Sequence, residues 1–443
     1  MSNIYSNRAY RHLFAAQVIA LVGTGMLTVA LGLLAYQLAG AQAGSVLGTA
    51  LAIKMVAYVL IAPVVGAYAN RLPRRAFLVT MDLVRAGVAL SLPFVDQIWQ
   101  IYVLIFLLQS ASAAFTPTFQ ATIPDVLPDE KEYTKALSFS RLAYDMENLV
   151  SPLLTAALLT VISFHWLFGG TVVGFLCSAA LVASVSLPRA GGTPSTGGVF
   201  AKTFRGISIY LRTPRLRGLL CLNLVAAAGS AMVIVNTVVY IQARLGRSAS
   251  DVPLGLGAFG LGSMLMALTL PKLLEKRDDR PVMLLGATVV MLGLVGGEVV
   301  ASVGGSYEWP AFLITWFVIG LGYSTTLTPS GRLLRRSARA EDRPAVFAAQ
   351  FSLSHVCWLA TYPIAGTLGA MMGMPATFIV LAVVAAAGLA GAFLLWPATD
   401  PDALDHSHDQ SAAGEHLHDG EQTTPGRHRH AFTIDDQHPR WPV

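Results

Sequence analysis

The sequence predicts an all-α membrane protein with twelve transmembrane helices in two six-helix halves. Three observations lead to this fold class. Of the 443 residues, 54% are hydrophobic and only 12% are charged; apolar runs of about 20 residues recur along the chain; and the second half repeats features of the first. This composition excludes a soluble globular protein of the same length. The three cysteines all fall inside apolar runs, so a disulfide framework is not expected.

Each apolar run is long enough to cross the hydrocarbon layer of a bilayer, which is about 30 Å thick. Because lipid offers no partner for backbone N–H and C=O groups, each run is expected to form an α-helix. The first run is too long for a cleavable signal peptide and is expected to remain as a helix. In chain order the expected spans are 13–39, 46–69, 77–95, 100–122, 139–162, 166–187, 217–242, 252–275, 282–303, 310–330, 345–370 and 375–396.

Basic residues gather in alternate loops, and this pattern sets the orientation. With twelve spans, one side of the membrane collects most of the Lys and Arg, whereas the other side carries only Arg244 and Arg247. By the positive-inside rule the rich side is the cytoplasm, so both termini are expected there. The net charge of +5 follows from this distribution and does not indicate nucleic-acid binding.

The chain divides between the sixth and seventh spans. The segment 188–216 begins rich in Gly, Pro and Ser and continues as a basic amphipathic helix. Thr116-Pro117 in the fourth span recurs as Thr328-Pro329 in the tenth, which is one of several matches in the same order and at similar spacing. The expected units are an N-terminal six-helix bundle (1–187), a cytoplasmic linker (188–216), a C-terminal six-helix bundle (217–399) and a disordered tail (400–443).

Ionisable side chains within the spans are costly and are therefore candidates for function. Asp82 and Arg85 lie three residues apart on one helix face, and we interpret them as a structural pair. Glu147 has no basic residue three or four positions away, so it either handles a proton or cation or forms an interhelical ion pair, for instance with Lys54. His355, near the middle of the eleventh span, is either a hydrogen-bonded core residue or a titrating group.

The last 44 residues differ from everything before them. Segment 400–443 holds nine Asp or Glu, three Arg and seven His, so it cannot bury a core and is expected to be disordered without a ligand. Imidazole suits Ni²⁺, Cu²⁺, Zn²⁺ and Co²⁺, and neighbouring carboxylates help to complete the shell. A solvated acidic tail with incidental histidines is the alternative. The candidate metal ligands form three His-x-His pairs and one later histidine: His406, His408, His416, His418, His428, His430 and His438.

The loop between the second and third spans resembles the signature loop of the major facilitator superfamily. It reads GAYANRLPRR, in which an Asn and a Pro replace the family's Asp and second Gly. The positions that match are Gly66, Arg71, Arg74 and Arg75. Together with the repeat and the number of spans, this resemblance implies the major facilitator fold.

The superfamily resemblance also implies a cavity lined by spans 1, 4, 7 and 10. Span 7 offers the neutral amides of Asn223 and Asn236. No carboxylate lies at depth in these four spans, so a cation site would need Asp145 and Glu147 of span 5. We therefore take these two acids as candidates for cation and proton handling.

Two further stretches bear on the cargo. The ending HAFTIDDQHPRWPV resembles nickel-resistance exporters of this superfamily, and FTPTFQATIPDVLP resembles its enterobactin-exporter and macrolide-efflux branch. The first resemblance implies export of Ni²⁺, with Co²⁺ as an additional guest, across the inner membrane of a bacterium. The chain has no ATP-binding P-loop, so proton antiport is expected to supply the energy, although span 5 lacks glycines of the family's antiporter pattern.

The expected partners are the metal cation as substrate, protons and the lipid bilayer, with no cofactor and a monomeric state. No nucleophile–base constellation stands in the soluble segments, so an enzyme is not expected. Two alternatives stay open. One is a drug or siderophore exporter of the same fold, which the mostly neutral cavity spans would suit. The other is a non-transporting metal sensor that binds metal without changing the metal content of the cell.

Overall fold

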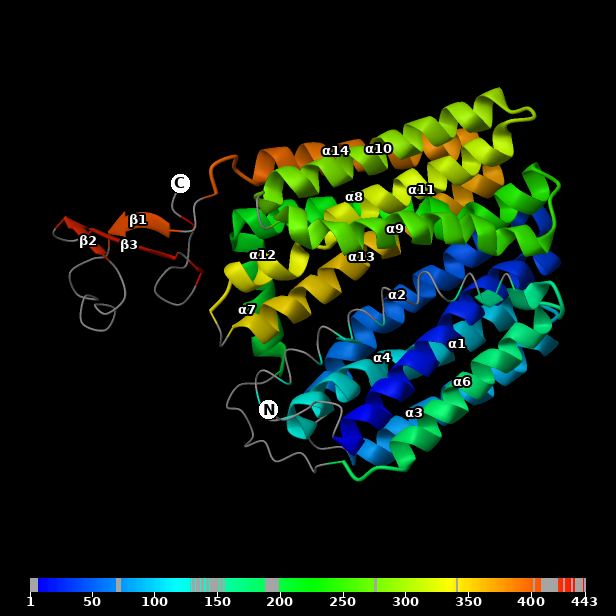
Figure 1. Ribbon diagram of the computed structural model, residues 1–443, viewed down its shortest axis with the longest axis horizontal. Coiled ribbons are helices and arrows are strands. Elements are labelled where there is room, and N and C mark those ends of the chain that lie inside the picture. Colours follow the sequence, from blue (N-terminus) through cyan, green and yellow to red (C-terminus); the bar gives the residue numbers. More distant parts are fainter. Residues whose placement is uncertain are drawn as a thin grey trace.

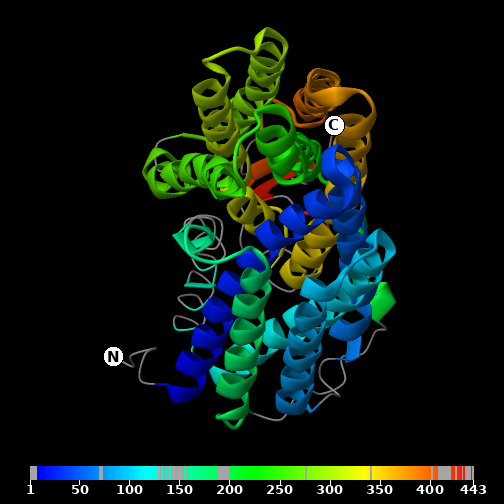
Figure 2. The ribbon, with the colours of Figure 1, turned by 90° about the vertical axis from the view of Figure 1, so that its right-hand side faces the viewer.

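The computed structural model describes residues 7–68, 73–127, 157–187, 199–274, 277–339, 342–400, 403–407, 421–424 and 427–431, with isolated positions between 129 and 155 and at 433, 434 and 441. Long helices run nearly along one direction and form two bundles, one from each half of the sequence (Figure 1). Figure 2 looks at the end of the molecule opposite the termini, where α1–α6 lie below α8–α14.

The N-terminal bundle contains α1 (Arg8–Ala39), α2 (Ala43–Tyr68), α3 (Arg74–Ser91), α4 (Ile98–Val126) and α6 (His165–Ala183). Asn7 caps α1, because its side-chain oxygen accepts the backbone N–H of Tyr10 at 3.1 Å. Gly40 ends α1 at a φ of 53°, which glycine adopts at little steric cost. The 3-10 turns η2 (Gly40–Gln42) and η3 (Leu92–Phe94) follow α1 and α3.

The C-terminal bundle begins with α8, which has a proline at its first position, where the missing N–H costs no hydrogen bond. A π-helical turn, η4, and a 3-10 turn, η5, separate α8 from α9, and the short helix α12 continues α11. The elements are α8 (Pro214–Val239), η4 (Tyr240–Arg244), η5 (Ala249–Asp251), α9 (Val252–Leu274), α10 (Asp279–Val303), α11 (Glu308–Leu327), α12 (Ser330–Arg336), α13 (Arg343–Met371) and α14 (Gly373–Leu395).

Eleven of the twelve expected spans correspond to long helices of the described chain, and their ends agree to within a few residues. The fifth expected span, 139–162, lies largely outside the described residues. Nine helical segments of the described chain are long and apolar enough to cross a membrane, and one of them, Arg8–Ile61, joins α1 to most of α2. The expected class, an α-helical multi-pass membrane protein, is confirmed.

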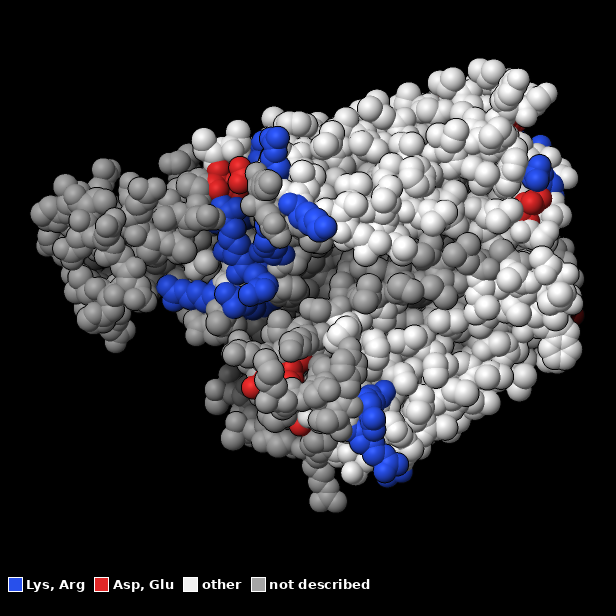
Figure 3. Space-filling model, in the orientation of Figure 1, with Lys and Arg blue, Asp and Glu red and all other residues white. Residues whose placement is uncertain are grey.

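Charged side chains mark the two ends of the bundles. Figure 3 shows Lys and Arg gathered at the end where the termini lie, a few charges at the opposite end, and an uncharged surface between them. That surface carries large exposed apolar side chains such as Leu107, Leu268 and Val383, as expected for helices that face lipid. The arrangement matches the orientation inferred from the loops, with the termini on the cytoplasmic side.

The linker contains one helix, α7 (Val199–Arg212), which packs against α13. Arg205 Nε donates to Asp342 Oδ1 at 2.8 Å, and the Tyr210 hydroxyl donates to Gln350. Burial raises the pKa of the Tyr210 phenol well above its usual value, so this hydroxyl stays protonated and remains a donor. The basic amphipathic helix expected in the linker therefore attaches to the C-terminal bundle through specific contacts.

The tail differs from the expected disordered segment at the positions that the structure describes. Strands β1 (Ala403–Ser407), β2 (Glu421–Thr424) and β3 (Arg427–Ala431) form an antiparallel sheet in the order β1-β3-β2. Asp405 and Glu421 are both register partners of Arg429. Opposite charges in register favour pairing between strands, which composition alone does not reveal, because it carries no information about register.

Candidate functional site

The two bundles meet mainly along α2 and α13, and His355 lies at this contact. The ring of Tyr58, on α2, stacks on the His355 ring with centroids 5.5 Å apart and planes 7° apart. Phe351 lies next to the imidazole on its own helix, at a centroid distance of 4.1 Å. Lys54 Nζ is 6.0 Å from the Tyr58 ring centroid, so a cationic side chain flanks the same cluster.

The hydrogen bond of His355 identifies its basic nitrogen. Nδ1 lies 2.6 Å from the backbone oxygen of Phe351. A carbonyl only accepts, so the neutral imidazole carries its proton on Nδ1 and has its lone pair on Nε2. His355 can therefore accept a proton at Nε2 while it contacts both bundles, an arrangement in which its charge affects how the bundles pack.

Glycines bring α2 and α13 together toward their outer ends. A Cβ added to Gly48 would lie 2.6 Å from the backbone oxygen of Tyr362 and 3.2 Å from the Cα of Gly366. Small residues four apart, as Gly44 and Gly48 are, allow helix backbones to approach closely in membranes. The outer parts of the two bundles are thus in direct backbone contact.

Of the two amides expected to line the cavity, only Asn236 reaches this contact. Its Nδ2 donates to the backbone oxygen of Ala365 on α13 at 3.1 Å, and a Cβ on Gly44 would lie 3.0 Å from its Oδ1. Asn223 is buried, and its Nδ2 donates to Leu219 on its own helix at 2.8 Å. Asn236 therefore helps to join the bundles, whereas Asn223 belongs to the interior of the C-terminal bundle.

Asp82 and Arg85 lie inside the N-terminal bundle, where they form an ion pair. Asp82 is 0% exposed and also accepts the Ser178 hydroxyl at 2.8 Å. The Arg85 guanidinium lies between two aromatic rings, 4.2 Å from the Phe115 centroid and 4.5 Å from that of Phe175. These contacts join α3, α4 and α6, and they support the structural interpretation.

Two of the signature-loop arginines hold the cytoplasmic end of the N-terminal bundle. Arg74 forms an ion pair with Asp125 at the end of α4, and Arg75 donates to the backbone oxygen of Ala183 at the end of α6. Arg71 lies outside the described residues, and Gly66 is in the last turns of α2. Asp125 was not among the predicted site residues, although the acid that ends span 4 in the stretch IPDVLP was a signal for it.

The C-terminal bundle has an equivalent pair of contacts at its own cytoplasmic end. Asp279, the first residue of α10, pairs with Arg332 of α12 at 2.6 Å, and Arg280 donates to the backbone oxygen of Trp396 at 2.9 Å. The third helix of each half thus begins with an ion pair to the fourth helix and an arginine bound to the end of the sixth. The acid and the base of the ion pair have exchanged places between the two halves.

The remaining candidates are placed only in part. Asp145 and Glu147 lie outside the described residues, as do His408, His416, His418 and His438. The backbone of the sheet places His406 in register with His428, and Leu404 in register with His430. Within the described part of the chain, no three His, Cys, Asp or Glu side chains come together as a metal site.

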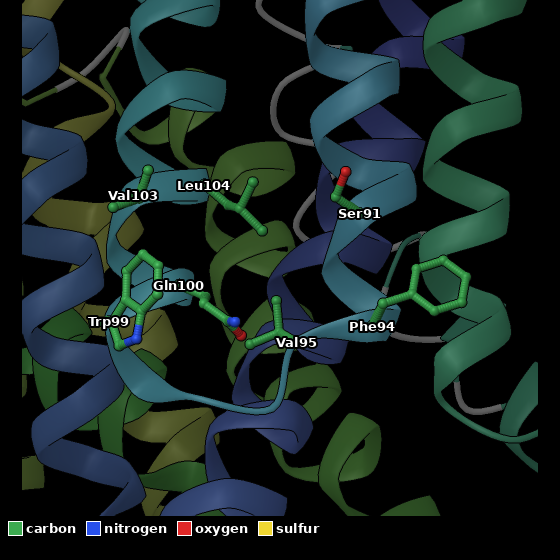
Figure 4. A pocket seen from close by; sticks show the side chains of 7 residues that line it. All are labelled: Ser91, Phe94, Val95, Trp99, Gln100, Val103 and Leu104. Carbon is green, nitrogen blue, oxygen red and sulfur yellow. The ribbon is translucent and has the colours of Figure 1, made fainter.

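A cavity of about 290 Å³ lies at the outer turn between α3 and α4 (Figure 4). Its lining is mostly apolar and includes no charged side chain: Ser91, Phe94, Val95, Trp99, Gln100, Val103 and Leu104. All of these residues belong to the N-terminal bundle. Because alternating access operates at the contact between the bundles, we do not assign transport to this cavity.

Two pseudo-equivalent helical bundles that meet at a contact with ionisable side chains define a secondary transporter. The chain belongs to the Major Facilitator Superfamily, whose family model matches residues 13–235 and 219–419. The fold is therefore the one that the sequence predicts, and the protein is a multi-pass membrane transporter.

Relatives and solved structures agree with this assignment. The uncharacterized MFS-type transporter YfiS of Bacillus subtilis is 24% identical over 336 residues, 73% of this chain and 78% of that protein. Macrolide efflux protein A of Streptococcus pyogenes is 24% identical over 184 residues, which is 40% of this chain and 45% of that protein. The names of these two relatives refer to macrolide efflux or to no cargo.

Two solved structures show the same fold at low identity. The nucleoside transporter NupG superposes with a TM-score of 0.70 at 11% identity, covering 88% of this chain and 100% of that chain. A bacterial homolog of the human lysosomal transporter Spinster, inward-facing and unoccupied, gives a TM-score of 0.66 at 14% identity, covering 90% of this chain and 100% of that chain. At these identities the likeness concerns the fold alone.

Proposed function

We propose that this transporter exports a divalent transition-metal cation, Ni²⁺ in the first place and Co²⁺ as an additional guest, across a bacterial inner membrane in exchange for protons. The histidine-rich tail is the observation that carries the proposal. Its His-x-His pairs supply borderline nitrogen ligands that suit Ni²⁺. Strand pairing supports it further, because the register brings the pair at 406 and 408 beside the pair at 428 and 430 in the chain fold.

His355 takes the proton rather than the metal in this mechanism. Tyr58 and Phe351 pack against its ring, so the Nε2 edge is the part that remains for chemistry. Metal coordination needs several ligands, and the described residues place no further ligands there. One proton at Nε2 adds a charge beside Lys54 at the contact between the bundles, which favours their separation. Glu147 and Asp145 are the acids proposed to pass the metal.

Purified protein in sealed vesicles tests the proposal. An imposed proton gradient is expected to drive Ni²⁺ movement, reported by a metal-sensitive dye in the lumen. His355→Gln is expected to abolish the coupling to the gradient, and Glu147→Gln to abolish metal movement. His165→Gln at the outer end of α6 is the matched control and should transport normally. Vesicles that carry the unaltered protein and move no Ni²⁺ under any gradient would overturn the proposal.

Export of an amphiphilic drug is the second candidate function. The match to macrolide efflux protein A favours it, as do the neutral amides of α8, Asn223 and Asn236. Cells that express the protein would then grow on graded macrolide and stay sensitive to nickel. A metal sensor would instead bind Ni²⁺ while leaving both the resistance and the intracellular nickel content unchanged.

A further inference from the structure

The tail is attached to the C-terminal bundle at its beginning. Trp396 Nε1 donates to Asp400 Oδ2 at 3.0 Å, where the chain leaves α14. The same carboxylate lies 3.7 Å from Arg215 Nε at the start of α8 and 3.5 Å from Arg336 Nη1 at the end of α12. Asp400 therefore receives one neutral donor and two guanidinium groups.

The tail also returns to the same place near its end. Ile434 is 4% exposed and belongs to the main hydrophobic core. Trp441 packs against that core, and its ring centroid is 4.9 Å from the Arg215 guanidinium carbon. Arg215 is 2% exposed, so its buried guanidinium contacts the carboxylate of Asp400 and the ring of Trp441, two side chains from opposite ends of the tail.

We propose that Ile434 and Trp441 form a C-terminal latch, an intramolecular ligand that docks on Arg215 and closes the tail into a loop on the C-terminal bundle. The chemistry fits such an occupant. A guanidinium out of water is attracted to an indole face, and a buried isoleucine leaves water when it docks. The entropic cost of closing a loop grows only slowly with its length.

The partners of the latch decide what it moves with. Arg215, Arg336, Trp396 and Asp400 all belong to α8–α14 or to the chain that directly follows them. The latch therefore holds the histidine-rich loop on one bundle and leaves the other bundle free to rock. This inference concerns how the tail is held and does not depend on which cargo the transporter carries.

Thiol labelling of the full-length protein tests the latch. Ile434→Cys places a thiol at a buried position, and its reaction with a maleimide is followed by peptide mass spectrometry, which separates it from the three native cysteines. Adding Trp441→Ala or Arg215→Gln is expected to raise the labelling rate on the order of tenfold, the equilibrium factor of one desolvated cation–π contact. Arg335→Gln is the matched control, an exposed arginine on α12 beside Arg336, and should leave the rate unchanged.

A second measurement avoids the introduced cysteine, which could itself loosen docking. Deuterium uptake of the peptide that spans 433–441 is compared in the unaltered protein and in Trp441→Ala, Arg215→Gln and Arg335→Gln. The first two substitutions are expected to increase uptake of this peptide while leaving peptides from α10 and α14 unchanged. Uptake and labelling that ignore both substitutions, or that respond equally to Arg335→Gln, would overturn the latch.

Discussion

Replacing Asp82 with Asn tests whether the buried ion pair of the N-terminal bundle is structural. The substitution keeps the shape of the side chain and an oxygen for Ser178, but it removes the charge opposite Arg85. Arginine stays protonated in proteins, so a guanidinium that is 6% exposed would be left without its counter-charge. Removing one partner of a buried pair costs about 3–5 kcal/mol of stability.

The aromatic contacts of Arg85 do not cancel this cost. Phe115 and Phe175 flank the guanidinium before and after the substitution, so their attraction enters both states of the comparison. Replacing both partners with apolar residues of similar volume, Asp82→Leu with Arg85→Met, is expected to be far milder, because no buried charge remains. Asp125→Asn is the matched control: its carboxylate is 41% exposed, and such pairs contribute about 1 kcal/mol or less.

Thermal unfolding in detergent, followed by size-exclusion chromatography of the heated samples, ranks the variants. We expect Asp82→Asn to melt well below the unaltered protein, and both Asp125→Asn and the double apolar variant to melt close to it. Transport by the double variant in vesicles completes the test. A double variant that folds normally but does not transport would refute the structural interpretation and make the charges themselves part of the mechanism.

Two further predictions concern the contact between the bundles. Gly48→Ala would place a Cβ 2.6 Å from the backbone oxygen of Tyr362, so we expect the outer ends of α2 and α13 to separate, which thiol labelling of added outer-end cysteines would detect as increased access; unchanged access would show that the contact is loose. Tyr58→Phe keeps the ring that stacks on His355, whereas Tyr58→Leu removes it. We therefore expect the pH dependence of transport in vesicles to shift in the Leu variant alone, and equal shifts in both variants would contradict a role for the stack.

The sequence predicts the helices well because the solvent dictates them. In lipid every backbone polar group needs an internal partner, so an apolar run of sufficient length leaves one local solution, and α8 and α14 begin and end within a few residues of their expected spans. Ion pairs within one helix, such as Asp82 with Arg85, are also predictable, because the helix period fixes which side chains are neighbours.

Contacts between helices could not be predicted in this way. Tyr58 and His355 stack across the two bundles, but nothing in the periodicity of α2 indicates which residue of α13 it faces. The partner of Arg74 is an acid on another helix, whose position depends on how far α3 and α4 extend into the cytoplasm. The attachment of Trp441 is of the same kind: a single residue near the end of a polar segment contacts an arginine that is remote in the chain.

The exchanged ion pairs of the two halves have different electrostatic settings. Helix N-termini carry partial positive charge and C-termini partial negative charge, each worth about 0.3–1 kcal/mol to a suitably charged side chain. Asp279 at the start of α10 and Arg332 in the last turns of α12 both match these charges. Arg74 at the start of α3 and Asp125 near the end of α4 both oppose them. The N-terminal pair is therefore the weaker of two contacts that occupy equivalent positions.

Reversing each pair tests this difference. Arg74→Asp with Asp125→Arg aligns the N-terminal pair with its helix dipoles and is expected to raise the melting temperature, whereas Asp279→Arg with Arg332→Asp is expected to lower it. The opposite signs are the informative result, because both double variants keep the net charge and an ion pair at the same place. Equal signs would show that side-chain packing, rather than the helix dipole, sets the polarity of each contact. If the signs are opposite, the cytoplasmic end of the N-terminal bundle is the one that yields more easily when the transporter changes state.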